Sequence, residues 1–175
     1  MKHPTLYIMV GISGSGKSTV AQSIARATGA VIVSPDYWRK LLTGDVNNQE
    51  SNAMVFPSAL RELSTSLANG HSVVWDATNT TVTARKNVLD AATSECHVVF
   101  VYVRTTLETA LDRVKSRDNG QVVPEAVVRR QHKQLMNSLE ELLNNNFTTI
   151  VVKNNREIDE DMLDNMVFFW YNEDR

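Results

Sequence analysis

The sequence predicts an α/β protein in which a parallel sheet is covered by helices on both faces. Apolar runs of strand length alternate with segments of helical periodicity, the connections between them are short, and the first apolar run ends in a glycine-rich loop that opens a helix. Such alternation is typical of parallel sheets, because each helix returns the chain to the same end of the sheet. The 175 residues show no internal repeat and no linker, so one domain over residues 1–175 is expected.

The first elements set this pattern. Residues 5–10 form an apolar run (TLYIMV) that ends at Gly11, as expected for a strand buried on both faces. Residues 17–28 repeat apolar side chains at helical spacing, and Gly29 is a typical helix stop. Residues 30–34 are the second strand candidate, so the chain begins as a parallel sheet would.

The middle of the chain continues the alternation. Leucine and valine recur at helical spacing in residues 51–69, and Gly70 ends this helix. Residues 71–75 predict the third strand, residues 83–93 a helix, and residues 96–103 a fourth strand with a continuous apolar centre.

The last part of the chain adds three helices and a strand. Residues 107–114 have a helical pattern, and Pro124 is an acceptable first-turn residue for a long helix over 125–143. Residues 148–152 predict a fifth strand, and residues 158–170 a last helix. The aromatic residues of this last helix indicate a packed face, with a self-association surface, and hence a homo-oligomer, as the second interpretation.

The composition restricts the class of protein. A hydrophobic content of 42% is ordinary for a globular protein, and a net charge of −2 argues against a general nucleic-acid coating role, although a local basic groove is compatible with it. Cys96, the single cysteine, lies in an apolar run, so we expect an inert thiol in a reducing compartment. The first apolar run is too short for a signal peptide or a membrane span, and a cytoplasmic location is expected.

The glycine-rich loop carries the clearest chemical signal. The string GISGSGKS over residues 11–18 fulfils the P-loop pattern, whose glycines let backbone N–H groups turn onto phosphate oxygens. Lys17 then places a cation near the β- and γ-phosphates, and Ser18 offers a hydroxyl to Mg²⁺. A chance match is the alternative, but the loop follows a buried strand and opens a helix, as the mechanism requires. We expect ATP and Mg²⁺ to bind here, through Gly11, Ser13, Gly14, Ser15, Gly16, Lys17, Ser18 and Thr19.

Polar residues also follow the second strand. Asp36 can accept a proton from an attacking hydroxyl, and Arg39, one helical turn further on, can bind an anionic group of the phosphate acceptor. The carboxyl ends of parallel strands are where such folds place their sites. The alternative is that Asp36 caps a helix and Arg39 is a solvated helix residue.

The third strand ends in a similar way. Asp76 is placed to join Ser18 in the shell of the Mg²⁺ ion. Asn79 either positions the acceptor or shapes the turn. Arg85 lies on the following helix, and the pattern alone leaves its role open.

A third cluster contains Arg113 and Arg117, followed by a glycine-containing hinge. Negative charge spreads over the equatorial oxygens in phosphoryl transfer, so arginines delivered by a mobile segment can stabilise the transition state. Their spacing places both arginines on one helix face. The alternative is a solvated basic stripe.

Together these motifs resemble the polynucleotide 5′-hydroxyl kinase family, specifically the kinase modules of the phage polynucleotide kinase–phosphatase and of the bacterial RNA-repair kinase. The resemblance covers nearly the whole chain and includes residues 123–131 (VPEAVVRRQ) and Phe147. It implies a P-loop kinase fold with the strand order 2-3-1-4-5 and a helical lid over about residues 113–126. The chain shows no phosphatase signature, so a 3′-phosphatase activity is not expected.

The resemblance also implies roles for individual residues. Lys17 would act on the ATP phosphates, Asp36 would be the general base on the 5′-hydroxyl, and Arg39 would contact a phosphate of the acceptor strand. The substrate-binding residues would be Asp36, Arg39, Asp76, Asn79 and Arg85, the metal ligands Ser18 and Asp76, and the lid arginines Arg113 and Arg117. The expected partners are ATP and the 5′-hydroxyl ends of DNA or RNA, with no membrane.

Two other functions stay open at the level of the sequence. Gluconate kinases have a similar length and a similar glycine-rich loop, so a small-molecule kinase that acts on a sugar acid, a nucleoside or an antibiotic is the main rival. A nucleotide-binding module or regulatory ATPase without a phosphoacceptor is the third interpretation, and the combination of Asp36 with Arg39 argues against it.

Overall fold

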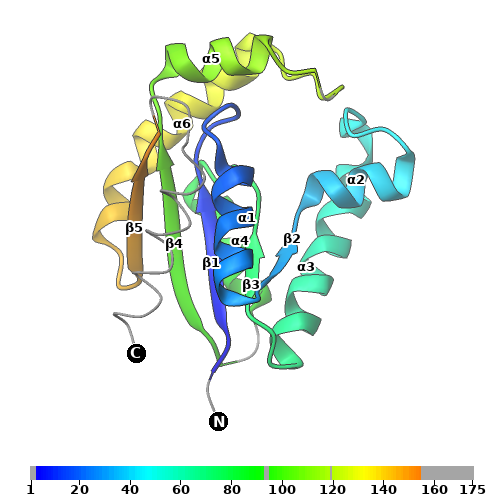
Figure 1. The fold of residues 1–175 in the computed structure, drawn as a ribbon, viewed down its shortest axis with the longest axis vertical. Coiled ribbons are helices and arrows are strands. Elements are labelled where there is room, and N and C mark those ends of the chain that lie inside the picture. Colours follow the sequence, from blue (N-terminus) through cyan, green and yellow to red (C-terminus); the bar gives the residue numbers. More distant parts are fainter. Residues whose placement is uncertain (1–2, 93–94, 119, 155–175) are drawn as a thin grey trace.

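The computed structural model describes residues 3–92, 95–118 and 120–154. Five parallel strands form one sheet in the order β2-β3-β1-β4-β5 (Figure 1). The strands are β1 (Thr5–Val10), β2 (Val31–Val33), β3 (Val73–Trp75), β4 (His97–Arg104) and β5 (Thr148–Lys153). The expected parallel sheet and its strand order are therefore confirmed.

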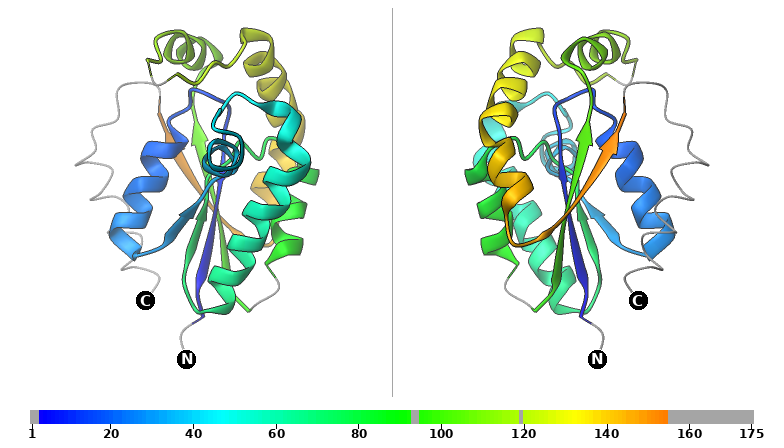
Figure 2. Two further views of the ribbon diagram at one scale, coloured as in Figure 1. Left: turned by 90° about the vertical axis from the view of Figure 1, so that its right-hand side faces the viewer. Right: turned by 90° about the vertical axis from the view of Figure 1, so that its left-hand side faces the viewer.

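Helices cover both faces of this sheet. The α-helices are α1 (Lys17–Thr28), α2 (Pro35–Thr43), α3 (Asn52–Ala68), α4 (Val82–Ala91), α5 (Leu107–Lys115) and α6 (Glu125–Asn144), and a 3₁₀ turn, η1 (Gln49–Ser51), precedes α3. Helix α1 lies on one face, whereas α3, α4 and α6 lie on the other (Figure 2). Helices α2 and α5 lie toward the end of the sheet at which β1 and β4 terminate (Figure 1).

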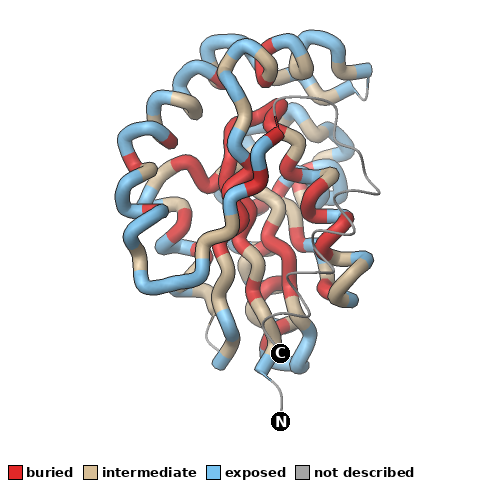
Figure 3. Tube along the Cα trace, turned by 60° about the vertical axis from the view of Figure 1, so that its left-hand side comes forward, coloured by how far each residue is buried: buried red, intermediate tan, exposed pale blue. Residues whose placement is uncertain are grey.

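The central strand shows why this arrangement is stable. Leu6 and Ile8 of β1 are fully buried in the core beneath α3, α4 and α6, whereas Met9 belongs to the core beneath α1. Successive side chains of a strand point to opposite faces, so a continuous apolar run fills both cores. Each such side chain contributes about 1.5–3 kcal/mol by leaving water. The buried part of the chain accordingly follows the inner strands (Figure 3).

The limits of the expected elements agree with the sequence pattern to within two or three residues, whereas α2 and η1 were not among the expected elements. Helix α5 ends at Lys115, so Arg117 lies in the irregular connection to α6 and the prediction that Arg113 and Arg117 share a helix face is wrong. The sequence after residue 115 favours turns, and Gly120 has a φ of 77°. The segment that is expected to form the lid, about residues 113–126, therefore contains the end of α5, an irregular connection and the start of α6.

Two further expectations concern other parts of the chain. The helix expected over residues 158–170, with its self-association surface, lies outside the described residues. Of the helices that the structure describes, none is long and apolar enough to span a bilayer.

Candidate active site

The glycine-rich loop follows β1 and leads into α1. Gly14 has a φ of 83°, and a Cβ atom added there would lie 2.3 Å from the backbone oxygen of Ala110 in α5. Only glycine fits this close approach, because any other side chain would force apart the loop and the helix. The loop is therefore seated directly on α5.

Side chains from three distant segments hold the backbone of this loop. Gln131 of α6 accepts a hydrogen bond from the backbone N–H of Ser13 at 2.9 Å. Arg113 donates to the Gly14 carbonyl at 3.4 Å, and Asn154 donates through Nδ2 to the Ser15 carbonyl at 2.6 Å. The loop is thus fixed by its neighbours as well as by its own glycines.

The sequence alone predicted no role for two of these residues, Asn154 and Gln131. Asn154 follows β5 at the same edge of the sheet as the other polar residues, so the rule that identified Asp36 and Asp76 could also have identified it. Gln131 lies in the stretch 123–131 that carries the family resemblance, but nothing in its spacing indicated a contact with the loop. Arg113 was expected over the phosphates, whereas here it braces the loop and Asn154.

Lys17 and Asp76 form the charged centre of the site. The Lys17 ammonium donates to the carbonyl of Ile12 at 2.8 Å, and burial lowers the pKa of Lys17 to about 8, an effect that the charge of Asp76 opposes. Burial raises the pKa of Asp76, while Lys17 and a hydrogen bond with Ser18 act in the opposite direction. These two groups stabilise each other's charge at the point where phosphates would enter.

Ser18 and Asp76 also fit a magnesium ion. A hydroxyl and a carboxylate are hard oxygen ligands, and they lie within hydrogen-bond reach of each other. Mg²⁺ in nucleotide sites is held by one or two such groups and by the phosphates, so this pair suffices on the protein side.

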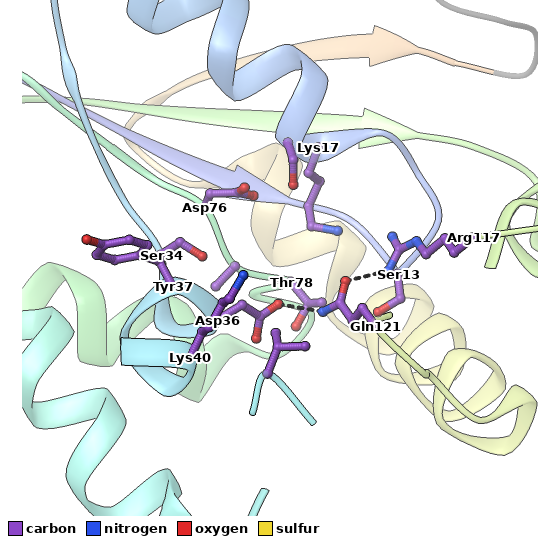
Figure 4. Close-up of a pocket in the computed structure, with 13 residues that line it drawn as sticks. Ser13, Lys17, Ser34, Asp36, Tyr37, Lys40, Asp76, Thr78, Arg117 and Gln121 are labelled. Carbon is purple, nitrogen blue, oxygen red and sulfur yellow. Dashed lines mark hydrogen bonds between the residues drawn. The ribbon is translucent and has the colours of Figure 1, made fainter. Parts of the chain in front are cut away.

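A pocket of about 320 Å³ joins these residues to the lid and to α2. Its lining comes from four segments and includes Ser13, Lys17, Ser18, Asp36, Tyr37, Lys40, Asp76, Thr78, Arg117 and Gln121 (Figure 4). Of the residues expected to be catalytic or to bind metal, Lys17, Ser18, Asp36, Asp76 and Arg117 share this pocket. Arg39, Asn79, Arg85 and Arg113 do not line it.

Asp36 lies in the first turn of α2. Ser34 occupies the cap position, so Asp36 is not the helix cap that the alternative interpretation required. One carboxylate oxygen of Asp36 pairs with Arg39, and the other accepts a hydrogen bond from Gln121 Nε2 at 2.8 Å. The Asp36 side chain remains 51% exposed, so it is accessible from the pocket.

Arg39 has a different place from the one expected. Only 3% of it is exposed, and its guanidinium is bonded to Asp36 and, at 2.9 Å, to Asn52 Oδ1. In this position Arg39 holds the carboxylate of Asp36 and does not line the pocket. The cation of α2 that lines the pocket is Lys40, four residues after Asp36 and therefore on the same helix face.

Asn79 shapes the turn after β3. It has a φ of 46°, donates to the carbonyl of Met9 at 2.6 Å, and accepts from Trp75 Nε1 at 3.3 Å. Asparagine tolerates this left-handed conformation better than most residues. Of the two roles open for Asn79, the structure therefore favours the turn.

Arg85 is 2% exposed and connects α4 with α6. It donates to the carbonyls of Asn79 and Ser138 at 3.0 and 3.1 Å, and to Glu141 Oε2 at 2.5 Å. Its guanidinium is thus engaged in contacts inside the protein and does not line the pocket, so the structure favours a structural role.

Comparison with known proteins shows the family to which the chain belongs. The family model described as AAA domain (AAA_33) matches residues 6–142. An uncharacterized protein of Mycobacterium tuberculosis, Rv2004c, and one of Mycobacterium bovis, Mb2027c, are each 30% identical over an alignment of 137 residues that covers 69% of this chain. The matched region is 27% of the length of these relatives.

Solved structures share the fold at lower identity. A sugar kinase of Janibacter sp. HTCC2649 superposes with a TM-score of 0.69 at 20% identity, over 97% of this chain and 94% of that one. The Pnkp1/Rnl/Hen1 RNA repair complex contains a chain with a TM-score of 0.72 at 23% identity, over 81% of this chain and 47% of that one. A gluconokinase of Sinorhizobium meliloti gives 0.58 at 20% identity, over the whole of both chains.

Proposed function

The chain belongs to the AAA domain family AAA_33, and from this premise and the geometry of the pocket we propose that it transfers the γ-phosphate of ATP to the 5′-hydroxyl of a nucleic-acid end. One observation carries the proposal: Lys17 of the glycine-rich loop and Asp36 of α2 line the same pocket. A phosphate donor and a hydroxyl acceptor held at these two residues would meet within it. Phosphoryl transfer requires little more than such positioning and charge stabilisation.

The polar and charged residues of the site divide the reaction between them. The N–H groups of the loop and Lys17 bind the phosphates, and Ser18 and Asp76 would hold Mg²⁺, which neutralises charge on the phosphate oxygens. Asp36, oriented by Arg39, accepts the proton of the attacking hydroxyl. Arg117 lines the pocket from the lid and stabilises the charge that develops on the transferred group.

The choice of a nucleic-acid end rests on three supports. The order of the motifs resembles polynucleotide 5′-kinases. The fold is shared with a chain of an RNA repair complex, although at 23% identity this likeness extends to the fold alone. Lys40 and Tyr37 line the pocket beside Asp36, and together they offer a cation for a phosphate and an aromatic ring for a base.

The experiment is transfer of labelled γ-phosphate from ATP to a 5′-hydroxyl oligonucleotide. Wild type should label it, and Asp36→Asn should lower the rate by about 10²- to 10⁴-fold with ATP binding retained. Asp90→Asn, an exposed carboxylate on α4, is the matched control. No labelling by wild type, or full activity of Asp36→Asn, would overturn the proposal.

A small-molecule kinase is the second candidate, and the size of the pocket favours it. A volume of about 320 Å³ is at the small end of ligand sites and suits one sugar acid or nucleoside. The same assay should therefore include gluconate, nucleosides and aminoglycosides. Faster turnover of any of these than of the oligonucleotide would replace the first proposal by the second.

A further inference from the structure

The side chain of Asn47 forms two hydrogen bonds with the backbone of the lid. It lies in the connection between α2 and η1, donates through Nδ2 to the carbonyl of Gly120 at 3.0 Å, and accepts through Oδ1 from the N–H of Val122 at 2.8 Å. One carboxamide thus satisfies a carbonyl and an N–H that flank a single residue. That residue is Gln121, and its backbone is fixed on both sides.

The side chain of Gln121 crosses the pocket. Its Oε1 accepts from Arg117 at 2.7 Å, and its Nε2 donates to Asp36 Oδ2 at 2.8 Å (Figure 4). A guanidinium can only donate and a carboxylate can only accept, so this pair of partners sets the orientation of the amide. Gln121 therefore connects the arginine of the lid with the carboxylate of α2.

The same contacts leave Asp36 usable as a base. Arg39 holds one oxygen and Gln121 the other, so the plane of the carboxylate is fixed from both sides. Each carboxylate oxygen has two lone pairs, and one donor at Oδ2 leaves the second for a hydroxyl. Gln121 thus orients Asp36 without consuming its capacity to accept a proton.

We propose that Gln121 and Asn47 are positioning residues that set Asp36 and Arg117 relative to each other. The inference rests on the proposed function, because it assigns these two residues to the same transfer reaction. Gln121 links Arg117 to Asp36, and Asn47 fixes the backbone on either side of Gln121. The base and the arginine are thereby held in one arrangement.

Kinetics test the role of Gln121. Gln121→Ala removes both bonds and should lower kcat of transfer by about 10²-fold, the cost of misplacing a reacting group by about an ångström. The KM for ATP should stay close to that of wild type, because the contacts of the glycine-rich loop are intact. Gln121→Glu keeps an acceptor for Arg117 but places a carboxylate against Asp36, so it should not restore kcat. A rise in the KM for ATP with kcat unchanged would overturn the role.

Hydrogen exchange of backbone amides tests the contact between Asn47 and the lid, and the measurement requires no phosphate acceptor. In Asn47→Ala the N–H of Val122 loses its partner and should exchange markedly faster than in wild type. Asn48→Ala is the matched control, because within the described residues the Asn48 side chain makes no hydrogen bond. An unchanged exchange rate at the Val122 amide in Asn47→Ala would show that Asn47 does not hold the lid. If wild type transfers phosphate to no acceptor, the proposed function fails and the alignment role fails with it, while the exchange result still decides the contact between Asn47 and the lid.

Discussion

Lys17 and Asp76 line one pocket, and burial favours the neutral form of each. Burial lowers the pKa of Lys17 to about 8 and raises that of Asp76, and their mutual attraction limits both shifts. The charge state of the donor site in the free protein therefore depends on a pair of residues from two different strand ends, one after β1 and one after β3.

Removal of Asp76 should narrow the pH range of activity. The Lys17 ammonium is charged below its pKa of about 8 and loses its proton as the pH rises through that value. In Asp76→Asn the opposing charge is gone, so the pKa of Lys17 should fall and the alkaline loss of kcat/KM for ATP should begin at a lower pH. The ratio kcat/KM reports the free enzyme, so its pH profile is the measurement. An alkaline limb that stays in place or moves to higher pH would contradict the pairing.

Gly14→Ala should weaken ATP binding by about tenfold or more, equivalent to at least about 1.4 kcal/mol. The new methyl group would lie 2.3 Å from the Ala110 carbonyl, so the loop has to leave its seat on α5. Gly29→Ala is a matched control, because Gly29 has a similar positive φ of 71° and open space around the added atom. Titration with ATP compares the two variants, and equal affinities would show that the contact with α5 is unimportant.

Arg85→Ala should lower the free energy of unfolding by at least about 2 kcal/mol. Arg85 is buried, and its loss leaves the carbonyls of Asn79 and Ser138 without their donor. Lys86→Ala on the exposed face of the same helix should cost no more than about 1 kcal/mol. Denaturant unfolding gives both values. If Arg85→Ala were as stable as wild type but had a raised KM for the acceptor, Arg85 would be a substrate residue after all.

Lys40→Ala should discriminate between acceptors. Lys40 lines the pocket beside Asp36, whereas Arg39 is buried behind it. The KM should rise about tenfold for an acceptor with a phosphate next to the reacting hydroxyl, the loss of one charge-assisted hydrogen bond. An acceptor without that phosphate should be unaffected. Steady-state kinetics with a nucleoside and its 3′-monophosphate make the comparison, and equal effects on both would refute the assignment.

The sequence was sufficient for the architecture because each element carries its own signal. The apolar run over residues 5–10 supplies side chains to the cores on both faces of the sheet. The glycines of residues 11–16 belong to a loop with one well-known geometry. The fold, and the position of the glycine-rich loop at the end of β1, could therefore be predicted almost completely. Asp36 and Asp76 followed from the rule that strand ends gather at one edge.

The errors concern long polar side chains, whose direction the pattern does not determine. Arg39 and Lys40 are adjacent in sequence, yet one is buried against Asp36 and Asn52 and the other lines the pocket. Arg113 and Arg117 have helical spacing, but α5 ends between them. Gln121 and Asn47 lie in two separate connections between helices, and neither belongs to a motif. Their roles follow only from contacts in the folded protein.

The hydrogen bond from Asn154 to the Ser15 carbonyl links the end of β5 to the glycine-rich loop. Among the described residues, β5 pairs with β4 alone, and its last residue is followed directly by Asn154, which is buried against the glycine-rich loop. A phosphate group that rigidifies the loop should then also stabilise the end of β5. By reciprocity, fraying of β5 should weaken the binding of phosphate by the loop. Any ligand that rigidifies the glycine-rich loop should thus also stabilise this edge of the sheet.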